Sequence, residues 1–299
     1  MTARNPSLFL NPIAGRGRAN RRLPRILKLM EEAGVHAVVH QSTGVGDLEN
    51  QVCEAVRGGT TQLIVAGGDG SIHEAVNGIM EGGGGAALGV VPVGTGNDFA
   101  KASGIPLDWE AATTLLARRI ADDAGPRNID LGRMNERWFA NGAGIGLDAR
   151  VTQIARSYRW PIGDLVYLAA IFHAMVDGIA TPEILIEADE LHWDGPLTLA
   201  NVSNGPWVGG MFHIAPMAKN EDGILELLIA APVTRRRILQ LLPKLMRGSH
   251  MDETEIVHAS VRRVKVSASA AVPSHLDGEV QPLQSHFEIE VLPGALRLL

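Results

Sequence analysis

The 299-residue sequence contains one cysteine, Cys53. A single cysteine can form neither an intrachain disulfide nor a cysteine-ligated zinc site, so the composition fits a reducing cytoplasm best. No stretch approaches the ~18 uninterrupted apolar residues of a membrane span, and the best candidate, 165–176, lies between two aspartates. The first residues lack the apolar core of a signal peptide. We therefore expect a cytoplasmic protein without a membrane-spanning segment.

Acidic residues are missing from the first 28 positions, which carry seven Lys and Arg residues. The whole chain has a net charge of −6, so the remainder sets 20 basic against 33 acidic residues, a net charge of −13. A basic N-terminal region favours phosphates or an anionic membrane as partners. A solvated helix face explains the same charge equally well.

Glycine, by contrast, is abundant, with 34 residues, and 13 of them fall within 58–96. The total is about 11 % of the chain against a usual ~7 %. There is no triplet period, and 45 % of the residues are hydrophobic, which excludes collagen and low-complexity disorder. The cluster therefore needs a local explanation.

The first 130 residues alternate short, turn-bounded apolar runs with segments of helical periodicity. Such runs are typical of buried parallel strands, and their alternation with helices predicts a doubly wound α/β layer. Pro24 suits only the first turn of its helix, and Asp108 is the expected N-cap of the last helix. The expected strands are 7–10, 35–40, 62–66 and 87–92, and the expected helices are 22–33, 47–57, 71–80 and 109–120.

From about residue 128 the pattern changes to short alternating segments separated by turn residues. This pattern is typical of an antiparallel sandwich or barrel-like domain. We therefore expect two domains, 1–127 and 128–299, with the last strand able to return to the first. The expected strands are 137–141, 183–188, 197–203, 224–230, 261–267 and 287–291, with turns at Asp194-Gly195, Asp222-Gly223 and Asp277-Gly278 and helices at 164–179 and 234–247.

Three glycine-containing turns follow strands of the first half, at 11–15, 67–71 and 93–99. Ligands bind at the carboxyl ends of parallel strands, and glycines let successive backbone N–H groups point at one anion. Asp69 would repel phosphates unless a cation such as Mg²⁺ lies between them. Together the turns predict a nucleotide site, although a glycine turn with a helix-capping aspartate would explain 67–71 alone. There is no P-loop, and the glycines of 142–146 are weak evidence for a dinucleotide site.

Several motifs occur in the order found in one known family. The Gly-Gly-Asp-Gly element alone would also fit NAD kinases or phosphofructokinases. Over essentially the whole chain, however, the sequence resembles the diacylglycerol kinase catalytic-domain family, which includes soluble bacterial lipid kinases and the sphingosine and ceramide kinases. The motifs are Asn11-Pro-x-Ala-Gly15, Gly67-Gly-Asp-Gly-Ser71 with Glu74 and Asn77-Gly78, Pro92–Ala100, Gly144–Ala149, Ala215–Gly223 and Leu276–Glu279.

The resemblance implies a doubly wound α/β domain that binds ATP and a β-sandwich-like second domain, with the active site in the cleft between them. Ser71 and His73 depart from the usual Thr and Asn of the family. Serine keeps the hydroxyl, and a surface histidine is the simpler interpretation of His73. The nucleotide contacts implied by the resemblance are Asn11, Pro12, Ile13, Ala14, Gly15, Thr43, Gly67, Gly68, Asp69, Gly70, Ser71, Ile72, His73 and Thr95.

The segment Asp277-Gly278-Glu279 supplies two carboxylates one residue apart. A carboxylate can take the proton of an attacking hydroxyl late in phosphoryl transfer. The resemblance places the proton acceptor here, or at Asp69 in some interpretations. We expect Asp277 and Glu279 to share base and metal duties and Asp69 to hold the catalytic Mg²⁺. Without the family, Asp277-Gly278 would be interpreted as a hairpin turn.

The resemblance also implies a second, structural Mg²⁺ in the turn that begins at Lys219. Its ligands would be the carboxylate of Asp222 and the main-chain oxygens of Lys219 and Ile224. Oxygen-only ligation from one turn is chemically reasonable for Mg²⁺.

Two apolar helices are candidates for contact with lipid. The segment 158–179 has more apolar residues than one helix face needs, which fits either a core helix or the lining of an acyl-chain pocket. The segment 234–247 mixes five Lys and Arg residues with leucines. It fits either an anionic membrane surface or an ordinary amphipathic helix with its apolar face in the core.

The sequence thus predicts an ATP- and Mg²⁺-dependent lipid kinase, a phosphotransferase with an alcohol acceptor, that converts diacylglycerol to phosphatidic acid. It would act from the cytoplasm on the inner membrane face, with a lipid substrate and an anionic membrane surface as partners and no nucleic acid. Whether it forms a homodimer is left open. The alternatives are a soluble-metabolite kinase of the NAD kinase or phosphofructokinase type and a non-catalytic, nucleotide-gated lipid-binding module.

Overall fold

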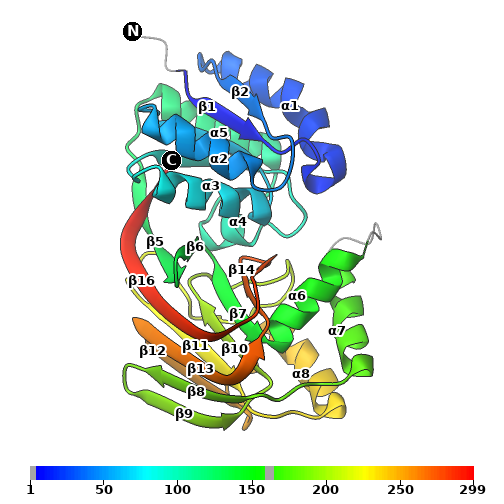
Figure 1. The fold of residues 1–299 in the computed structure, drawn as a ribbon. Helices are drawn as coiled ribbons and strands as arrows, with labels where there is room; N and C mark the ends of the chain where they lie inside the picture. Colours follow the sequence, from blue (N-terminus) through cyan, green and yellow to red (C-terminus); the bar gives the residue numbers. More distant parts are fainter. Residues whose placement is uncertain (1–4, 159–164) are drawn as a thin grey trace. The chain divides into compact units, whose positions relative to one another are not determined.

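The computed structural model describes residues 5–158 and 165–299 (Figure 1). The chain forms two compact units. The first unit holds the residues up to Asp130 together with Gly294–Leu299, and the second unit holds Leu131–Pro293. The expected division lies between residues 127 and 128. The last strand starts in the second unit and ends in the first.

The first unit is built on parallel strands in the order β2-β1-β3-β4. The end of β16 adds a further parallel strand beside β4, through Arg297 and Leu298. Helices α1 and α5 cover one face of these strands, and α2 and α3 cover the other (Figure 1). This arrangement confirms the predicted doubly wound α/β layer. The elements are β1 Ser7–Leu10, α1 Ala14–Glu32, β2 Val38–Gln41, α2 Asp47–Arg57, β3 Gln62–Gly67, α3 Asp69–Glu81, β4 Ala87–Pro92, α4 Asp98–Ala102 and α5 Trp109–Ala121.

The second unit is an antiparallel sandwich, as predicted. One sheet has the order β16-β13-β8-β9, and the other has the order β12-β11-β10-β7-β14-β15. Apolar side chains from both sheets form one buried core, among them Phe139, Ile186, Leu227 and Phe287. Two strands, β5 Arg127–Met134 and β16 Gln284–Leu298, lie partly in this unit and partly in the first. The others are β6 Arg137–Phe139, β7 Gly142–Gly146, β8 Glu183–Ala188, β9 Leu191–Pro196, β10 Leu199–Ser203, β11 Leu225–Ala230, β12 Ile256–Val261, β13 Arg263–Val272, β14 Ser274–Leu276 and β15 Glu279–Val280.

Three helices belong to the second unit: α6 Leu147–Ser157, α7 Leu165–Asp177 and α8 Arg235–Arg247. Helices α6 and α7 pack on each other through small buried side chains such as Ala155, Ala170 and Ala174. Within residues 5–158 and 165–299, no helix combines the length and the apolar content that a bilayer span requires.

Two local predictions are wrong. Helix α1 begins at Ala14 rather than at residue 22, so Pro24 lies in its interior instead of its first turn. Backbone hydrogen bonds from Ala14 N–H to Asn11 C=O (3.0 Å) and from Gly17 N–H to Ile13 C=O (3.1 Å) start the helix early, in a stretch whose glycines resemble a loop. The pair Asp194-Gly195 lies inside β9, and the turn before it falls at Asp189, where φ is +41°.

Part of the glycine cluster serves helix packing. A Cβ atom on Gly78 of α3 would lie 2.5 Å from the carbonyl oxygen of Glu49 and 2.9 Å from Cβ of Val52, both on α2. A Cβ atom on Gly89 of β4 would lie 2.8 Å from the methyl groups of Leu116 on α5. These glycines let the helices approach closer than any side chain would allow.

We expect Gly78→Ala to destabilise the protein by about 1–3 kcal/mol, because the added methyl group overpacks the contact between α2 and α3. Alanine is the better helix former by ~1 kcal/mol, so propensity alone predicts the opposite sign. Urea unfolding measures the change. The control is Gly125→Ala, where no atom lies within 4 Å of the added Cβ. Equal stability of the two variants would contradict the packing argument.

Candidate active site

The predicted nucleotide-contact residues of the first unit gather at one edge of its sheet. The strands β1, β2, β3 and β4 are parallel neighbours, so the loops that follow them leave the same edge. Asn11, Thr43, Gly68 and Thr95 lie in these four loops. Side chains at this edge are solvent-accessible, since Thr43 and Thr95 are exposed and Ile13 is 74 % exposed.

The loops after β3 and β4 touch through their backbones. A Cβ atom on Gly94 would lie 2.5 Å from Cα of Gly68, which leaves no room for a side chain at this contact. The carboxylate of Asp69 accepts a hydrogen bond from the backbone N–H of Phe99 at 3.0 Å. Asp69 therefore joins the start of α3 to the start of α4, and the N-terminal N–H groups of α3 face the edge where an anion would bind.

The residues after Asp69 turn into the unit. Ser71 packs against Gly67, where a Cβ atom would overlap the serine side chain. Ile72 and His73 are buried, and the Nδ2 group of Asn77 donates to the carbonyl of His73 at 2.9 Å. The interpretation of His73 as a surface residue is therefore wrong. Eight of the 13 residues of α3 are buried, so His73 is enclosed together with its neighbours on the helix.

Two further loops at this edge are held by short polar contacts. The Oδ1 atom of Asn11 accepts the N–H of Ile13 at 3.1 Å. The carboxylate of Asp47, at the start of α2, accepts the N–H and the hydroxyl of Thr43 at 2.6 Å and 2.8 Å. These hydrogen bonds from Thr43 hold the pKa of Asp47 below its ordinary value. The sequence analysis missed Asp47, although an aspartate in a first helical turn, four residues after a threonine, is a recognisable signal.

In the second unit, Asp277 and Gly278 form the two-residue turn between β14 and β15. Their φ angles of +50° and +84° are those of a type I′ hairpin. The interpretation of Asp277-Gly278 as a hairpin turn is therefore correct.

The Asp277 side chain points back to the connection between β6 and β7. Its carboxylate accepts the backbone N–H groups of Ala140, Asn141 and Gly142 at 2.9, 2.8 and 3.0 Å. Both oxygens are thus engaged by backbone amides, and the turn is anchored to the strand that leads into α6.

The Glu279 carboxylate pairs instead with a side chain. It forms an ion pair with the guanidinium of Arg156 on α6. Arg156 also donates to the carbonyl of Gly278 at 3.0 Å. The two carboxylates therefore have different partners: Asp277 accepts hydrogen bonds from backbone amides, and Glu279 pairs with an arginine side chain.

A buried Asp–His pair supports the same turn, and the sequence analysis missed it. Nε2 of His275 lies 3.2 Å from Oδ2 of Asp148, and Asn201 donates to that oxygen at 3.0 Å. Burial, the largest single influence, would lower the pKa of His275, but the charge and hydrogen bond of Asp148 together with the charges of Asp277 and Glu279 raise it. Burial likewise opposes the charge of Asp148, yet His275 and Asn201 keep its pKa below the ordinary value.

The glycines of β7 explain how this pair fits. A Cβ atom on Gly144 would overlap both Asp148 and His275, so the pair occupies the space over a bare backbone. The segment 142–146 is a sandwich strand between β10 and β14 rather than a nucleotide loop. In the sequence, the glycine four residues before Asp148 was the signal that could have indicated a polar side chain packed over bare backbone.

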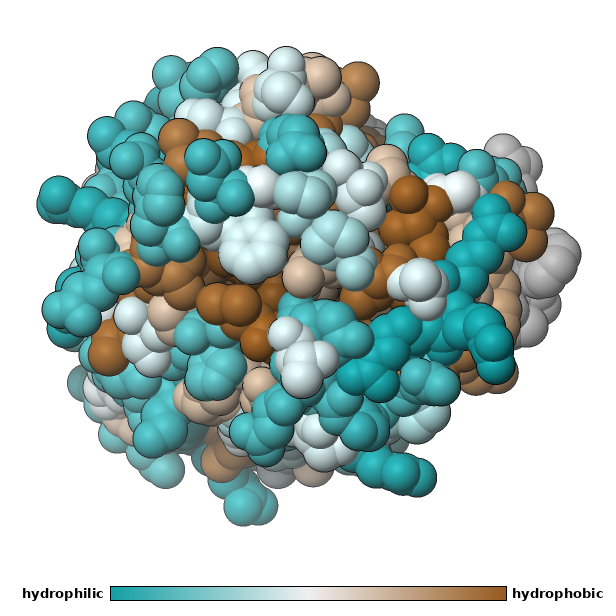
Figure 2. All heavy atoms as spheres, turned by 90° about the horizontal axis from the view of Figure 1, so that it is seen from below, coloured by the Kyte–Doolittle hydropathy of each residue, from teal (hydrophilic) through white to brown (hydrophobic). Residues whose placement is uncertain are grey.

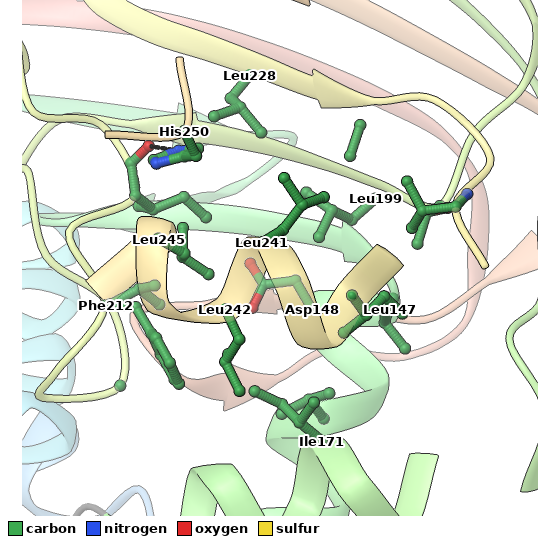
Figure 3. Close-up of a pocket in the computed structure, with 18 of the residues that line it drawn as sticks. Leu147, Asp148, Ile171, Leu199, Phe212, Leu228, Leu241, Leu242, Leu245 and His250 are labelled. Carbon is green, nitrogen blue, oxygen red and sulfur yellow. Dashed lines mark hydrogen bonds between the residues drawn. The ribbon is translucent and has the colours of Figure 1, made fainter. Parts of the chain in front are cut away.

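An apolar cavity lies within the second unit, between α6, α7, α8 and the strands β10 and β11 (Figure 3). The cavity has a volume of about 130 Å³ and is partly open to solvent. Tyr167 of α7 lines the cavity, and its hydroxyl comes within 3.9 Å of the place where a Cβ atom on Gly278 would lie. The lining includes Leu147, Leu199, Phe212, Leu228, Leu241, Leu242, Leu245 and the charged Asp148.

The described part of the apolar segment 158–179 packs on α6 and also lines the cavity, while an acyl chain in that cavity stays a prediction. Ala170 and Ala174 are buried against α6, and Tyr167 and Ile171 line the cavity. Trp160, Pro161 and Ile162, which belong to the same prediction, lie outside the described residues.

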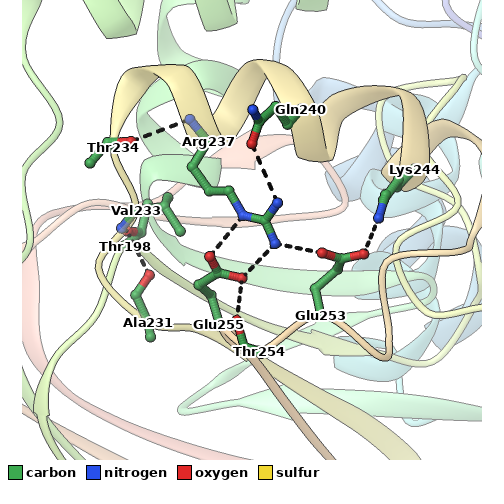
Figure 4. Close-up of polar contacts among 10 residues, drawn as sticks. All are labelled: Thr198, Ala231, Val233, Thr234, Arg237, Gln240, Lys244, Glu253, Thr254 and Glu255. Carbon is green, nitrogen blue, oxygen red and sulfur yellow. Dashed lines mark hydrogen bonds and ion pairs between the residues drawn. The ribbon is translucent and has the colours of Figure 1, made fainter.

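Helix α8 covers the cavity without being buried itself. Its apolar side, including Ile238, Leu241, Leu242 and Leu245, lines the cavity, yet none of its residues is fully buried. A set of ion pairs fastens the helix to the segment before β12 (Figure 4). In this clasp, Arg237 bonds Glu255 at 2.7 and 2.9 Å and also pairs with Glu253, which Lys244 contacts as well.

The turn predicted to hold a structural Mg²⁺ is present, with Gly223 at a φ of +73°. The carboxylate of Asp222 accepts the N–H of Ile224 at 3.1 Å. In the part of the chain that the structure describes, no group of three or more His, Cys, Asp and Glu side chains could hold a metal ion. The site at Lys219, Asp222 and Ile224 depends on main-chain oxygens and stays a prediction.

The clasp should make stability depend on pH. Hydrogen bonds from Arg237 lower the pKa of Glu255 from the usual 4.5 to about 2. A depressed folded-state pKa stabilises the fold above the ordinary pKa, and this contribution is lost as the pH falls toward about 2. We therefore expect Glu255→Gln to reduce the free energy of unfolding at neutral pH, with the difference from wild type shrinking as the pH falls.

Urea unfolding at a series of pH values measures this difference. Glu288→Gln is the control, since Glu288 lies 3.8 Å from Lys265 in a far more exposed pair. A constant difference between Glu255→Gln and wild type at all pH values would argue against the clasp.

Comparison with known proteins gives a consistent answer. The model of the diacylglycerol kinase catalytic domain matches residues 6–134, and that of the YegS C-terminal NAD kinase beta sandwich-like domain matches residues 142–299. A diacylglycerol kinase of Bacillus subtilis is 32 % identical over 275 residues, which cover 91 % of this chain and 88 % of that protein. A Pseudomonas aeruginosa protein named "Probable lipid kinase YegS-like" is 31 % identical over 286 residues, covering 95 % and 91 %.

The fold comparison agrees. A crystal structure of a diacylglycerol kinase from Bacillus anthracis superposes with a TM-score of 0.72 at 21 % identity, covering 100 % of this chain and 97 % of the other. The two family models together span nearly all of the sequence, and the expected fold and phosphotransferase class are confirmed. The chain belongs to the diacylglycerol kinase catalytic-domain family, whose members are phosphotransferases with an alcohol group as acceptor.

Proposed function

We propose that this protein transfers the γ-phosphate of ATP to the hydroxyl of a membrane lipid, with diacylglycerol as the acceptor and phosphatidic acid as the product. The observation that carries the proposal is the apolar cavity of the second unit, whose lining residue Tyr167 reaches the turn that bears Asp277 and Glu279. The apolar lining suits an acyl chain, and a lipid hydroxyl near Tyr167 would lie beside the turn that carries the two carboxylates. The names of the relatives from Bacillus subtilis and Pseudomonas aeruginosa support a lipid acceptor.

The loops of the first unit are suited to the phosphates of ATP. At Gly68 and Gly94 the backbone is bare of side chains, and the N-terminus of α3 directs N–H groups toward the same edge. Asp69 offers a carboxylate there, which is the kind of oxygen ligand that Mg²⁺ prefers. When bound, Mg²⁺ would neutralise charge on the phosphates.

The acceptor hydroxyl needs a group to take its proton. As its oxygen bonds to the γ-phosphorus, the bond from that phosphorus to the β–γ bridging oxygen breaks, ADP leaves, and the proton passes to a carboxylate. Asp277 uses both oxygens to hold three backbone N–H groups, which suits it to anchoring the turn. Glu279 is paired with a side chain, so we assign the proton to Glu279.

Two other functions remain as outcomes of the test. A soluble-metabolite kinase of the NAD kinase or phosphofructokinase type would have no need of an apolar cavity beside its carboxylates. A nucleotide-gated lipid-binding module would have no need of the carboxylates. The first alternative would leave the apolar cavity without a purpose, and the second would leave the carboxylates without one.

The test offers diacylglycerol in mixed micelles, NAD and sugar phosphates to the protein with γ-labelled ATP. We expect label in phosphatidic acid alone. Label only in NADP or a sugar phosphate would replace the proposal with a soluble-metabolite kinase, and binding of ATP and lipid without transfer would replace it with a binding module.

The cavity variant Leu242→Trp refines this test. It should raise the KM for diacylglycerol about tenfold, the scale of hydrophobic pocket effects, and leave the KM for ATP unchanged. The control is Leu283→Trp, at an exposed position of the second unit.

We propose further that α7 and α8 dock on an anionic membrane from the cytoplasmic side. Val176 of α7 is 76 % exposed, and its carbonyl accepts a hydrogen bond from Arg235 of α8 at 3.4 Å. Phe172 lies one turn before Val176, and Leu239 lies one turn after Arg235; both are exposed. Spacings of four place each pair on one side of its helix, so apolar and cationic side chains adjoin.

A surface of this kind suits a bilayer with anionic headgroups, since the apolar side chains can enter the interface while arginines meet the charge. Figure 2, which views the molecule from below, shows brown apolar patches bordered by teal polar side chains. Arg236 and Arg247, also exposed on α8, add positive charge.

Sedimentation with vesicles tests the docking. Arg236→Glu should weaken binding to vesicles of phosphatidylglycerol and phosphatidylcholine by about tenfold, since each basic residue near the surface contributes ~1 kcal/mol. Vesicles of phosphatidylcholine alone should bind the wild type and the Arg236→Glu variant weakly and to the same extent. The control is Arg118→Glu, at an exposed position of α5 in the first unit. Equal binding by both variants would rule out this surface.

A further inference from the structure

Helix α6 serves the cavity and the carboxylate turn at the same time. Asp148 and Thr152 of α6 line the cavity. Arg156, four residues beyond Thr152, lies on the same side of the helix and reaches Gly278 and Glu279. The helix that would contact the acceptor lipid thus also contacts the turn that would take its proton.

Arg156 makes two different contacts with the turn. It donates to the backbone carbonyl of Gly278 at 3.0 Å and pairs with the side-chain carboxylate of Glu279. The guanidinium is planar and its donors have a fixed geometry. One rigid group therefore ties the direction of the Glu279 side chain to the backbone beside it.

A second link from α6 holds the other side of Gly278. The N–H of Gly278 donates to Nδ1 of His275 at 3.2 Å, and Nε2 of the same ring lies 3.2 Å from Asp148. Since Nδ1 accepts a hydrogen bond, the ring carries its proton on Nε2, the nitrogen that faces Asp148. The N–H and the C=O of Gly278 are thus both fixed by residues of α6, one through His275 and one directly.

The type I′ turn needs this support. Asp277 is a non-glycine residue at positive φ, and the strand β15 that follows contains two residues. A strand this short contributes few ladder hydrogen bonds of its own. The position of Glu279, its first residue, therefore depends on contacts from outside the hairpin.

We propose that Arg156 is a positioning residue for phosphoryl transfer, which holds the Glu279 carboxylate in the direction required to accept the proton of the lipid hydroxyl. This inference rests on the proposed function, in which Glu279 is the proton acceptor. The Asp148–His275 pair supports the backbone of the same turn.

A structural role and a positioning role for Arg156 predict different results when the residue is removed: the first a loss of stability, the second a loss of rate. The side chains of Arg156 and Glu279 are 44 % and 28 % exposed, and exposed pairs contribute little to stability. Loss of Arg156 should therefore leave the fold intact. Misplacing a reacting group by about 1 Å, however, can lower a rate by about a hundredfold.

The experiment is a double-mutant cycle on kcat with diacylglycerol micelles. Arg156→Ala should lower kcat by about 10- to 100-fold, with the KM for ATP and the urea midpoint unchanged. Added guanidinium ion should restore part of the lost rate. In a Glu279→Gln background, Arg156→Ala should have no further effect, because its action passes through Glu279.

Arg150→Ala is the matched control, because Arg150 lies on the same helix with similar exposure and pairs with Asp177 at 2.9 Å. It should keep the wild-type kcat. Three results would overturn the inference alone: wild-type kcat in Arg156→Ala, an equal loss in Arg150→Ala, or an undiminished effect of Arg156→Ala in the Glu279→Gln background. Full turnover in Glu279→Gln itself would instead overturn the assignment of the proton acceptor.

Discussion

Backbone segments that approach each other at glycine set the form of both units. In the first unit, the loops after β3 and β4 meet at Gly68 and Gly94, with no space for a side chain. In the second unit, the Asp148–His275 pair lies over the bare backbone of Gly144. In the first unit the missing side chain leaves an open edge of N–H groups, and in the second unit it leaves space for the Asp148–His275 pair. Polar groups can then be placed where a Cβ atom would otherwise stand.

The residues around the Asp277–Glu279 turn show how one short segment can hold two carboxylates in different states of engagement. Asp277 accepts three backbone N–H groups, and these charge-assisted hydrogen bonds fix the chain at residues 140–142. Glu279 meets a guanidinium, which orients it without enclosing it in backbone. Two carboxylates one residue apart therefore have different partners, because their side chains leave the turn in different directions.

Helix α8 shows a related division between its two faces. Its leucines complete the wall of the cavity, while Arg237 and Lys244 join the clasp with Glu253 and Glu255 and the other arginines are exposed. None of its residues is fully buried, so the clasp adds polar contacts to the packing of its apolar side. One helix therefore supplies both an apolar wall to the cavity and a set of ion pairs at the surface.

Local pattern was enough for much of the fold. The strands β4 and β8 and helix α2 have their predicted bounds, and Asp108 caps α5 as expected, accepting the N–H of Ala111 at 2.8 Å. These elements have strong periodicity or a cap within a few residues. The start of α1 and the Asp194-Gly195 pair were predicted wrongly, because glycine in a helix or a strand has the same local signal as glycine in a turn.

The sequence by itself determined the two fold classes, the family and the motifs at the strand ends, because each depends on residues close together in the chain. Only the tertiary structure decided that His73 is buried, that Asp277 is bound by the amides of residues 140–142, and that Asp148 meets His275. These contacts join residues more than a hundred positions apart, or depend on which helix face meets the sheet. No local pattern encodes such distances, since they follow from how strands pair and helices pack.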